Sequence, residues 1–305
     1  MSTTIIGGSS YMKIALMIQC HKNPEQINLF LETMTHPSID FYIHVDKKSN
    51  IGEKIIEREN VWILPDSCRI DVRWADISQI DATLNLLRYV FNHGSYDFYW
   101  LCSGQDFPIK PISEIVRWFE SHTDNDFLEV LQSKNTGAPV ENNFDKRNAV
   151  FFPTWMLGSD NWKRIVKRIY TDFTGGYNRT FHWARRKPIN DFKFYFGSQW
   201  FCLTDRTLRW ILTYLSDHPE YYNYFRNCNC PDESFFHTLV MNSPYADKRK
   251  TYLHYIDWRE GKHSPSILRM EDMDLLMKSD KLIARKFDTE VDAEIIKALI
   301  EKINK

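Results

Sequence analysis

The chain has 305 residues with a formal net charge of −1, and aromatic residues make up 15% of it. The near-zero charge argues against non-specific nucleic-acid binding as the main activity, because that binding needs a basic field. No apolar run reaches the roughly 20 residues of a membrane span, and the first ten residues do not read as a secretory signal. We therefore expect residues 1–11 to be a disordered leader of a cytoplasmic protein.

Six cysteines are scattered along the chain, mostly in apolar surroundings, and Cys228 and Cys230 are too close together for the usual CxxC spacing. The spacing and apolar surroundings of these cysteines predict reduced thiols, no zinc site and no disulfide framework. Ten Trp, fifteen Tyr and twenty Phe can supply sugar-binding platforms as well as an aromatic core.

Strand-like and helix-like segments alternate in the first half of the chain. Strands are predicted at residues 13–19, 40–45, 61–64 and 97–102, and helices at 24–34, 76–91 and 111–121. This order predicts an α/β fold with a mostly parallel sheet covered by helices on both faces. Because ligands bind at the carboxyl ends of such strands, loops 44–48 and 103–106 are expected on the ligand side.

The second half begins with a polar loop at 133–148. A strand is predicted just before it, at 127–130. The elements predicted after the loop are a basic amphipathic helix at 160–173, a strand at 196–203, helices at 205–215 and 231–241, a strand at 251–256, and a terminal helix at 293–304. A second basic cluster follows the basic helix at 185–187. No repeat or Pro/Gly/Ser linker divides the chain, so one domain is expected over residues 12–305.

The segment Pro231–Asp232–Glu233 opens a predicted aromatic-rich helix. Pro231 suits the first helical position, and Asp232 is expected to cap the helix. Glu233 has no such local role on this reading, and burial can raise the pKa of such a carboxylate, which suits a general base. The alternative is a pair of acids that only stabilises the helix dipole.

Two adjacent cations, Arg285 and Lys286, lie in an apolar context near Asp288. Arg binds phosphate oxygens through a fork of donors and Lys binds them as a point charge, so the pair can hold a diphosphate. The alternative is a solvated basic pair with a local salt bridge. The sequence has neither G-x-G-x-x-G nor G-x-x-x-x-G-K-[ST], which weighs against dinucleotide oxidoreductases and P-loop enzymes.

Several carboxylates follow predicted strands. Asp46 and Asp106 lie at the proposed ligand edge, where each can bind sugar or nucleoside groups or simply form a turn. Asp124 and Asp126 resemble an Asp-x-Asp metal motif, although turn chemistry explains them well. No His pair has the spacing of H-E-x-x-H, and no G-x-S-x-G elbow is present.

Eight sequence blocks resemble glycosyltransferase family 14, the core-2/I-branching β-1,6-N-acetylglucosaminyltransferases and peptide O-xylosyltransferases. They occur in family order from about residue 12 to 288: IALMIQCHKNPEQINLF, FYIHVDKKS, RWADISQIDATLNLL, FYWLCSGQDFPIKP, GSQWFCLT, PDESFFHTL, YIDWREGKHSPSIL and LIARKFD. The last blocks are more similar to the xylosyltransferase and bacterial branches than to the animal core-2 branch.

The resemblance implies a GT-A-type fold, a UDP-sugar donor and an inverting single displacement without the Asp-x-Asp metal. It implies a nucleotide-sugar half over about 12–130, an acceptor-binding and catalytic half over about 131–290, and a C-terminal helix at 291–305.

Individual roles follow from the same resemblance. Glu233 matches the catalytic base, and Arg285 with Lys286 would stabilise the leaving UDP. Asp46 and Asp106 match donor-side positions. The sugar and acceptor pocket would include Trp200, Asp232 and Trp258.

The chain departs from the animal members of the family in three ways. It lacks their N-terminal anchor and their cysteine-rich pattern, which favours a bacterial-type cytoplasmic enzyme. A diphosphate-binding Arg of the core-2 branch has no clear counterpart near His263. The cations Arg249, Arg259 and Lys262 are candidates to replace it.

The leading hypothesis is a metal-independent inverting glycosyltransferase that moves GlcNAc or xylose from a UDP-sugar to a glycan or lipid-linked glycan, with no cofactor. Three alternatives stay open: a metal-dependent transferase using Asp124 and Asp126, a non-catalytic glycan-binding protein, and a glycoside hydrolase. With a lipid-linked acceptor, the basic segments 160–173 and 185–187 could rest on the inner face of an anionic membrane; otherwise they are solvated surface.

Overall fold

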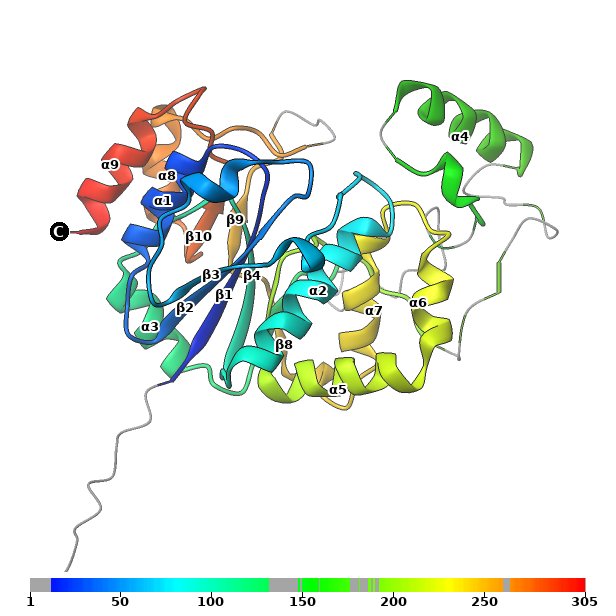
Figure 1. Cartoon of the computed structure of the whole chain (residues 1–305), viewed down its shortest axis with the longest axis horizontal. Coiled ribbons are helices and arrows are strands. Elements are labelled where there is room, and N and C mark those ends of the chain that lie inside the picture. Colours follow the sequence, from blue (N-terminus) through cyan, green and yellow to red (C-terminus); the bar gives the residue numbers. More distant parts are fainter. Residues whose placement is uncertain are drawn as a thin grey trace, which may run out of the picture.

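The computed structural model describes residues 12–131, 148, 150–158, 160–175, 181, 186–187, 189, 192–259 and 264–304. The predicted leader, nearly all of the loop at 133–148, and the cations Arg185 and Lys262 lie outside these residues. Figure 1 shows a central sheet with helices on both faces and one helix, α4, standing apart.

Seven strands form the main sheet. Their spatial order is β3 (Val61–Ile63), β2 (Ile39–Val45), β1 (Ile14–Cys20), β4 (Phe98–Ser103), β7 (Phe201–Thr204), β6 (Asp126–Leu128) and β8 (Arg249–Lys250). The strands β1 to β4 pair in parallel, whereas β7 runs antiparallel to both β4 and β6. This mostly parallel sheet with helices on both faces confirms the predicted α/β fold class.

A second sheet of three short strands carries part of the site. Its order is β5 (Asp106–Pro108), β10 (Ile283–Arg285) and β9 (His254–Ile256). Strand β10 pairs antiparallel with β5, which sets Arg285 opposite Asp106, and pairs in parallel with β9. Strands β5 and β10 were not predicted, because the pairing of residues so far apart in the sequence leaves no local pattern.

The alternation of side chains along β1 feeds two hydrophobic cores. Ile14, Leu16 and Ile18 point into one core, and Ala15 and Met17 point into the other, all of them buried. The sequence IALMIQ is continuously apolar for this reason, as is typical of a strand covered on both faces.

Helices fall into two groups according to the core that they cover. The first core is covered by α1 (Pro24–Thr33), α3 (Ile112–Glu120), α8 (Met273–Lys278) and α9 (Glu294–Ile303). The second core is covered by α2 (Ser78–His93), α5 (Asp205–Asp217), α6 (Pro219–Phe225) and α7 (Phe235–Met241), on the opposite side in Figure 1. The described chain also contains short 3-10 helices: η1 (Ile51–Lys54), η2 (Asp66–Cys68), η3 (Thr154–Met156), η4 (Pro231–Glu233), η5 (Ala246–Lys248) and η6 (Met270–Asp272).

Helix α4 (Asn161–Phe173) packs on a small separate core of Val150, Phe152 and Leu157. Within the described residues, no helix is both long enough and apolar enough to cross a membrane.

The predicted helix from Pro231 to 241 is two elements, the turn η4 and the helix α7. Ser234 separates them with φ −135° and ψ −30°, and it occupies the N-cap position of α7. The prediction that Asp232 caps this helix is therefore wrong. Asp232 is the middle residue of the preceding turn η4, and Glu233 is its last residue.

Candidate functional site

A cavity of about 820 Å³ lies at the carboxyl ends of β1, β2 and β4. Its lining includes Cys20 at the end of β1, His44 in β2 and Ser103 at the end of β4. This is the edge at which parallel α/β sheets bind ligands, and the volume is typical of small-molecule sites.

Seven of the eight predicted site residues line this cavity, although they come from distant parts of the sequence. They are Asp46, Trp200, Asp232, Glu233, Trp258, Arg285 and Lys286.

Arg285 forms a buried cationic end of the cavity, with 8% of its surface exposed. Its guanidinium carbon lies 4.0 Å from the ring centroid of Trp200. Its Nη1 lies 3.5 Å from Oδ1 of Asp106, and burial lowers the pKa of the guanidinium. An Arg stays protonated in proteins even so, and its Nε and Nη1 have no hydrogen-bond partner among the described residues. Both of these nitrogens are buried, so it is the positive charge of Arg285 at the end of the cavity that suits a polyanionic ligand.

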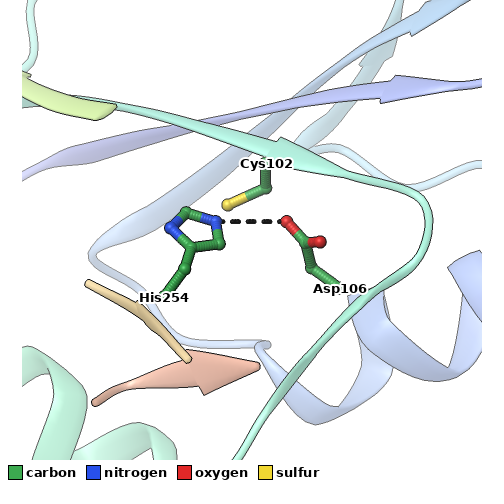
Figure 2. A group of neighbouring side chains, drawn as sticks. All are labelled: Cys102, Asp106 and His254. Carbon is green, nitrogen blue, oxygen red and sulfur yellow. Dashed lines mark hydrogen bonds and ion pairs between the residues drawn. The ribbon is translucent and has the colours of Figure 1, made fainter. Parts of the chain in front are cut away.

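Asp106 does not line the cavity, so its predicted contact with the donor needs correction. Its side chain is fully buried and accepts a hydrogen bond of 2.8 Å from the Ser103 backbone N–H. His254 Nε2 lies 3.2 Å from Asp106 Oδ2, and burial lowers the pKa of this histidine, so the neutral ring donates to the carboxylate. Figure 2 shows this pair facing each other. Asp106 thus pairs with Arg285 without lining the cavity itself.

One group of possible metal ligands occurs among the described residues: Cys102, Asp106 and His254, whose ligand atoms lie within 4.8 Å of one another (Figure 2). Arg285 already pairs with this carboxylate, and a metal ion there would face a buried positive charge. Burial also raises the pKa of the Cys102 thiol well above its usual range, which favours the protonated form. We interpret the group as a support for Arg285.

The Asp-x-Asp segment lies at the opposite end of the sheet from the cavity. Asp126 accepts hydrogen bonds from Thr204 and Thr207, and Thr204 pairs with Phe98 at the start of β4. Asp124 pairs with Arg206 at 2.9 Å. Neither acid belongs to the lining formed by the described residues, so the metal-dependent alternative has no support from this geometry.

Lys286 lines the cavity beside Arg285, with its Nζ 3.4 Å from Ser264 Oγ. The alternative of a solvated pair bridged to Asp288 is wrong for Arg285, which is buried and pairs with Asp106. Asp288 instead accepts hydrogen bonds of 2.6 Å from Lys22 Nζ and 2.8 Å from Asn23 Nδ2.

The turn that carries Glu233 is held by unusual backbone conformations. Cys230 and Ala75 both have left-handed backbones, with φ 52° and 66°, and the Cys230 N–H donates to the Ala75 carbonyl at 3.2 Å. The Gly197 N–H donates to the Glu233 carbonyl at 3.0 Å. A Cβ on Gly197 would lie 2.2 Å from the Glu129 carbonyl oxygen, so only glycine fits this close approach.

Sequence reasoning assigned no role to several other lining residues, although they lie within the family-like blocks. Gln79 Nε2 lies 3.3 Å from Gln19 Oε1 and 3.4 Å from Gln199 Oε1, which places three amides on one wall of the cavity. Trp74 lines the cavity with 54% of its surface exposed. Lys48 also lines it and is 3.6 Å from Asp46 Oδ2.

The candidates for an additional diphosphate-binding cation are not supported. Arg259 is held by Asp257 and Asp272, and Arg249 lies in β8 beside Asp126, far from the cavity. Lys262 lies outside the described residues. Lys48 is the further cation of the lining formed by the described residues, and its Nζ pairs with Asp71 at 2.6 Å.

Comparison with known proteins identifies the family. The family described as "Branch: Core-2/I-Branching enzyme" matches residues 14–276, so the chain belongs to the Core-2/I-branching enzyme family. The chain is 25% identical to Xylosyltransferase 1 of Homo sapiens over 93% of its own length and 30% of that protein. It is 25% identical to Xylosyltransferase 2 of Mus musculus, over 96% of the chain and 34% of that protein. The chain thus spans about a third of the length of these curated relatives.

Similar solved structures include the galactosyltransferase LgtC in complex with donor and acceptor sugar analogs, with a TM-score of 0.37 and 8% identity over 96% of each chain. Mouse Xyloside xylosyltransferase 1, in its apo form, has a TM-score of 0.36 and 8% identity over 90% of this chain and 96% of that one. Scores this low carry no argument about function.

Replacement of Gly197 by Ala tests the close approach at the Glu233 turn. We expect Gly197→Ala to lower the free energy of unfolding by about 1–3 kcal/mol, because the new methyl group overlaps the Glu129 carbonyl. Gly52→Ala is the matched control, since a Cβ there would meet its nearest neighbour at 3.9 Å. Denaturant unfolding of both variants measures the effect, and equal losses would contradict the account.

Two buried histidines predict how stability depends on pH. Burial lowers the pKa of both His44 and His237 from 6.5 to about 4. Between pH 6.5 and pH 4 the unfolded chain therefore binds more protons than the folded chain. The stability that the neutral histidines contribute is present above pH 6.5 and is lost as the pH falls toward 4. We expect a loss of roughly 2 kcal/mol per histidine between pH 7.5 and pH 5.

The measurement is denaturant unfolding across this pH range. The variant His237→Gln should have a shallower pH dependence than the wild type. His218→Gln, at a side chain that is 43% exposed, should leave the dependence unchanged. A wild-type stability that is flat between pH 7.5 and pH 5 would refute the prediction.

Proposed function

We propose that this member of the Core-2/I-branching enzyme family is an inverting, metal-independent glycosyltransferase. It transfers a sugar, GlcNAc or xylose, from a UDP-sugar to a hydroxyl group of a glycan acceptor. The observation that supports this most is that a single cavity is lined both by the acids Asp232 and Glu233 and by the cations Arg285 and Lys286.

On the donor side, Arg285 and Lys286 neutralise the diphosphate as it leaves. Arg285 is fixed before the ligand arrives, because Trp200 covers one face of its guanidinium and Asp106 pairs with its edge. A preorganised cation in a buried site stabilises developing negative charge more strongly than one in water, which typically lowers a barrier by several kcal/mol. This is the task that a metal ion performs in other transferases.

On the acceptor side, Glu233 removes the proton from the attacking hydroxyl oxygen. That oxygen forms a bond to the anomeric carbon while the bond to the UDP oxygen breaks on the opposite face, which inverts the configuration. The Gly197 N–H and the Cys230 turn hold the Glu233 backbone in place for this step. A base must lie within hydrogen-bond reach of the hydroxyl group that it activates.

Aromatic and amide groups on the cavity wall suit sugar binding. Trp74 and Trp258 are 54% and 52% exposed and offer flat apolar faces to ring C–H groups. The neighbouring amides of Gln19, Gln79 and Gln199 can donate to and accept from sugar hydroxyl groups. A hydrolase or a simple glycan-binding protein has no use for the buried cation, so transfer from a sugar nucleotide explains more of the site.

Replacement of the two acids separately tests the choice of base. We expect Glu233→Gln to lower kcat by at least about a hundredfold, because the general base is lost while donor binding is untouched. Asp232→Asn is the matched variant and should retain most of the activity. UDP release from UDP-GlcNAc and UDP-xylose with a glycan acceptor is the assay, and calorimetry measures UDP affinity.

The opposite ranking, with Asp232→Asn inactive and Glu233→Gln active, would move the role of base to Asp232. Loss of UDP affinity in Glu233→Gln would show that the variant disturbs the donor site and would overturn the assignment.

Removal of Lys286, the less buried member of the cationic pair, tests the donor side. We expect Lys286→Ala to raise the Kd for UDP about tenfold, because a charge-assisted contact with the diphosphate is lost. Lys278→Ala, at an exposed lysine of α8, is the control and should bind UDP like the wild type. Calorimetry of UDP binding gives both values, and an unchanged Kd for Lys286→Ala would remove this lysine from the donor site.

A further inference from the structure

Helix α4 turns its apolar face away from the rest of the molecule. Trp162, Ile165 and Ile169 are 52%, 61% and 63% exposed, and their spacing places them on one side of the helix. Phe173 continues the same row at 70% exposure. A contiguous row of large exposed apolar side chains usually marks an interaction surface.

The opposite side of α4 attaches the helix to the protein. Lys167 and Thr171 are the buried residues of the helix. The Lys167 Nζ donates to Asn229 Oδ1 at 3.0 Å and to the Gly158 carbonyl at 3.4 Å. The inward side thus carries two polar residues beside Tyr170, which packs on the small core, whereas the largest apolar side chains of the helix point outward. Figure 1 shows α4 at the margin of the molecule, apart from the sheet.

A neighbouring tryptophan extends this apolar row. Trp155 of η3 is 54% exposed and stacks on Trp162, with the ring centroids 6.5 Å apart and an angle of 13° between the planes. We refer to Trp155, Trp162, Ile165, Ile169 and Phe173 as the α4 surface.

The charge of α4 indicates what covers this surface. Residues 161–173 contain four cations, Lys163, Arg164, Lys167 and Arg168, against the single acid Asp172, a formal charge of +3 in a chain whose net charge is −1. Arg164 and Arg168 are exposed beside the apolar row. A second copy of the helix would bring like charges together, which opposes self-association through this face.

We infer that the α4 surface binds an anionic lipid bilayer. Tryptophan rings lie at the boundary between lipid headgroups and acyl chains, isoleucine and phenylalanine side chains enter the acyl region, and the arginines pair with lipid phosphates. Each cation near an anionic leaflet adds to the attraction. A helix with apolar and basic side chains together on its exposed surface is suited to lie in the plane of such a membrane.

Contact with Asn229 links this surface to the cavity. Asn229 lies three residues before Asp232 of the lining, so the buried side of α4 contacts the segment that carries the acids of the cavity. Combined with the proposed function, this predicts a lipid-linked acceptor. Membrane binding itself does not depend on that function, because no sugar nucleotide is needed to observe it.

Vesicle flotation of the purified full chain tests the inference. We expect the wild type to float with vesicles that contain about 30 mol% phosphatidylglycerol and to float poorly with pure phosphatidylcholine. The variant Ile165→Asn/Ile169→Asn should partition at least about tenfold more weakly. Arg164→Gln/Arg168→Gln should lose the preference for anionic vesicles.

A control variant, Leu275→Asn, changes a side chain that is 47% exposed on the distant helix α8 and should float like the wild type. Circular dichroism and UDP calorimetry establish that each variant is folded. A variant that binds UDP but no longer floats has therefore lost membrane binding through the α4 surface.

Three results would overturn the inference. The wild type could fail to float with either vesicle, or the isoleucine variant could float as well as the wild type. Alternatively, sedimentation velocity without lipid could show a dimer or a bound acidic polypeptide that depends on Ile165 and Ile169, with no flotation. UDP binding measured separately keeps each of these failures distinct from a failure of the proposed transfer.

Discussion

The pairing of a buried arginine with a buried aspartate is the interaction on which this site depends. Arg285 and Asp106 face each other across β10 and β5, with the ring of Trp200 over the guanidinium. Removing either charge would leave the other uncompensated in a poorly solvated environment, which is strongly destabilising. The neutral His254 and the Ser103 N–H both donate to Oδ2 of the carboxylate, which leaves Oδ1 to face Arg285. The three-stranded sheet therefore holds a positive charge near the carboxyl ends of the main-sheet strands, which is the edge where such sheets bind ligands.

The rest of the fold brings an acid to the same cavity. The two hydrophobic cores fix the main sheet, and the left-handed residues Ala75 and Cys230 join the segment before α2 to the turn that carries Glu233. Non-glycine residues in this conformation typically cost about 1–3 kcal/mol each, which a well-packed core can offset. Gly197 allows a second contact with this turn, the bond from its N–H to the Glu233 carbonyl. Left-handed backbone thus occurs on both sides of the contact that holds the acid-bearing turn at the cavity.

The sequence predicted the frame of this fold well, because strong patterns specify it. The apolar run of β1 and the helical spacing in α2 gave their type and place to within two residues. The strand pair β5 and β10 was missed, since pairing between residues 106 and 285 leaves no local pattern. For the same reason Asp106 was predicted to contact the donor, whereas its nearest charged partner in the structure is Arg285. The Gln19, Gln79 and Gln199 wall also comes from three separate elements, and no spacing in the sequence joins them.

The central claim is that protein cations, and no metal ion, hold the diphosphate. Calorimetric titration of the wild-type chain with UDP, once with excess EDTA and once with millimolar Mg²⁺ or Mn²⁺, tests it most directly. The account predicts the same Kd under both conditions, because Arg285, Lys286 and Lys48 supply the positive charge. Binding that disappears in EDTA and returns with the metal would contradict it.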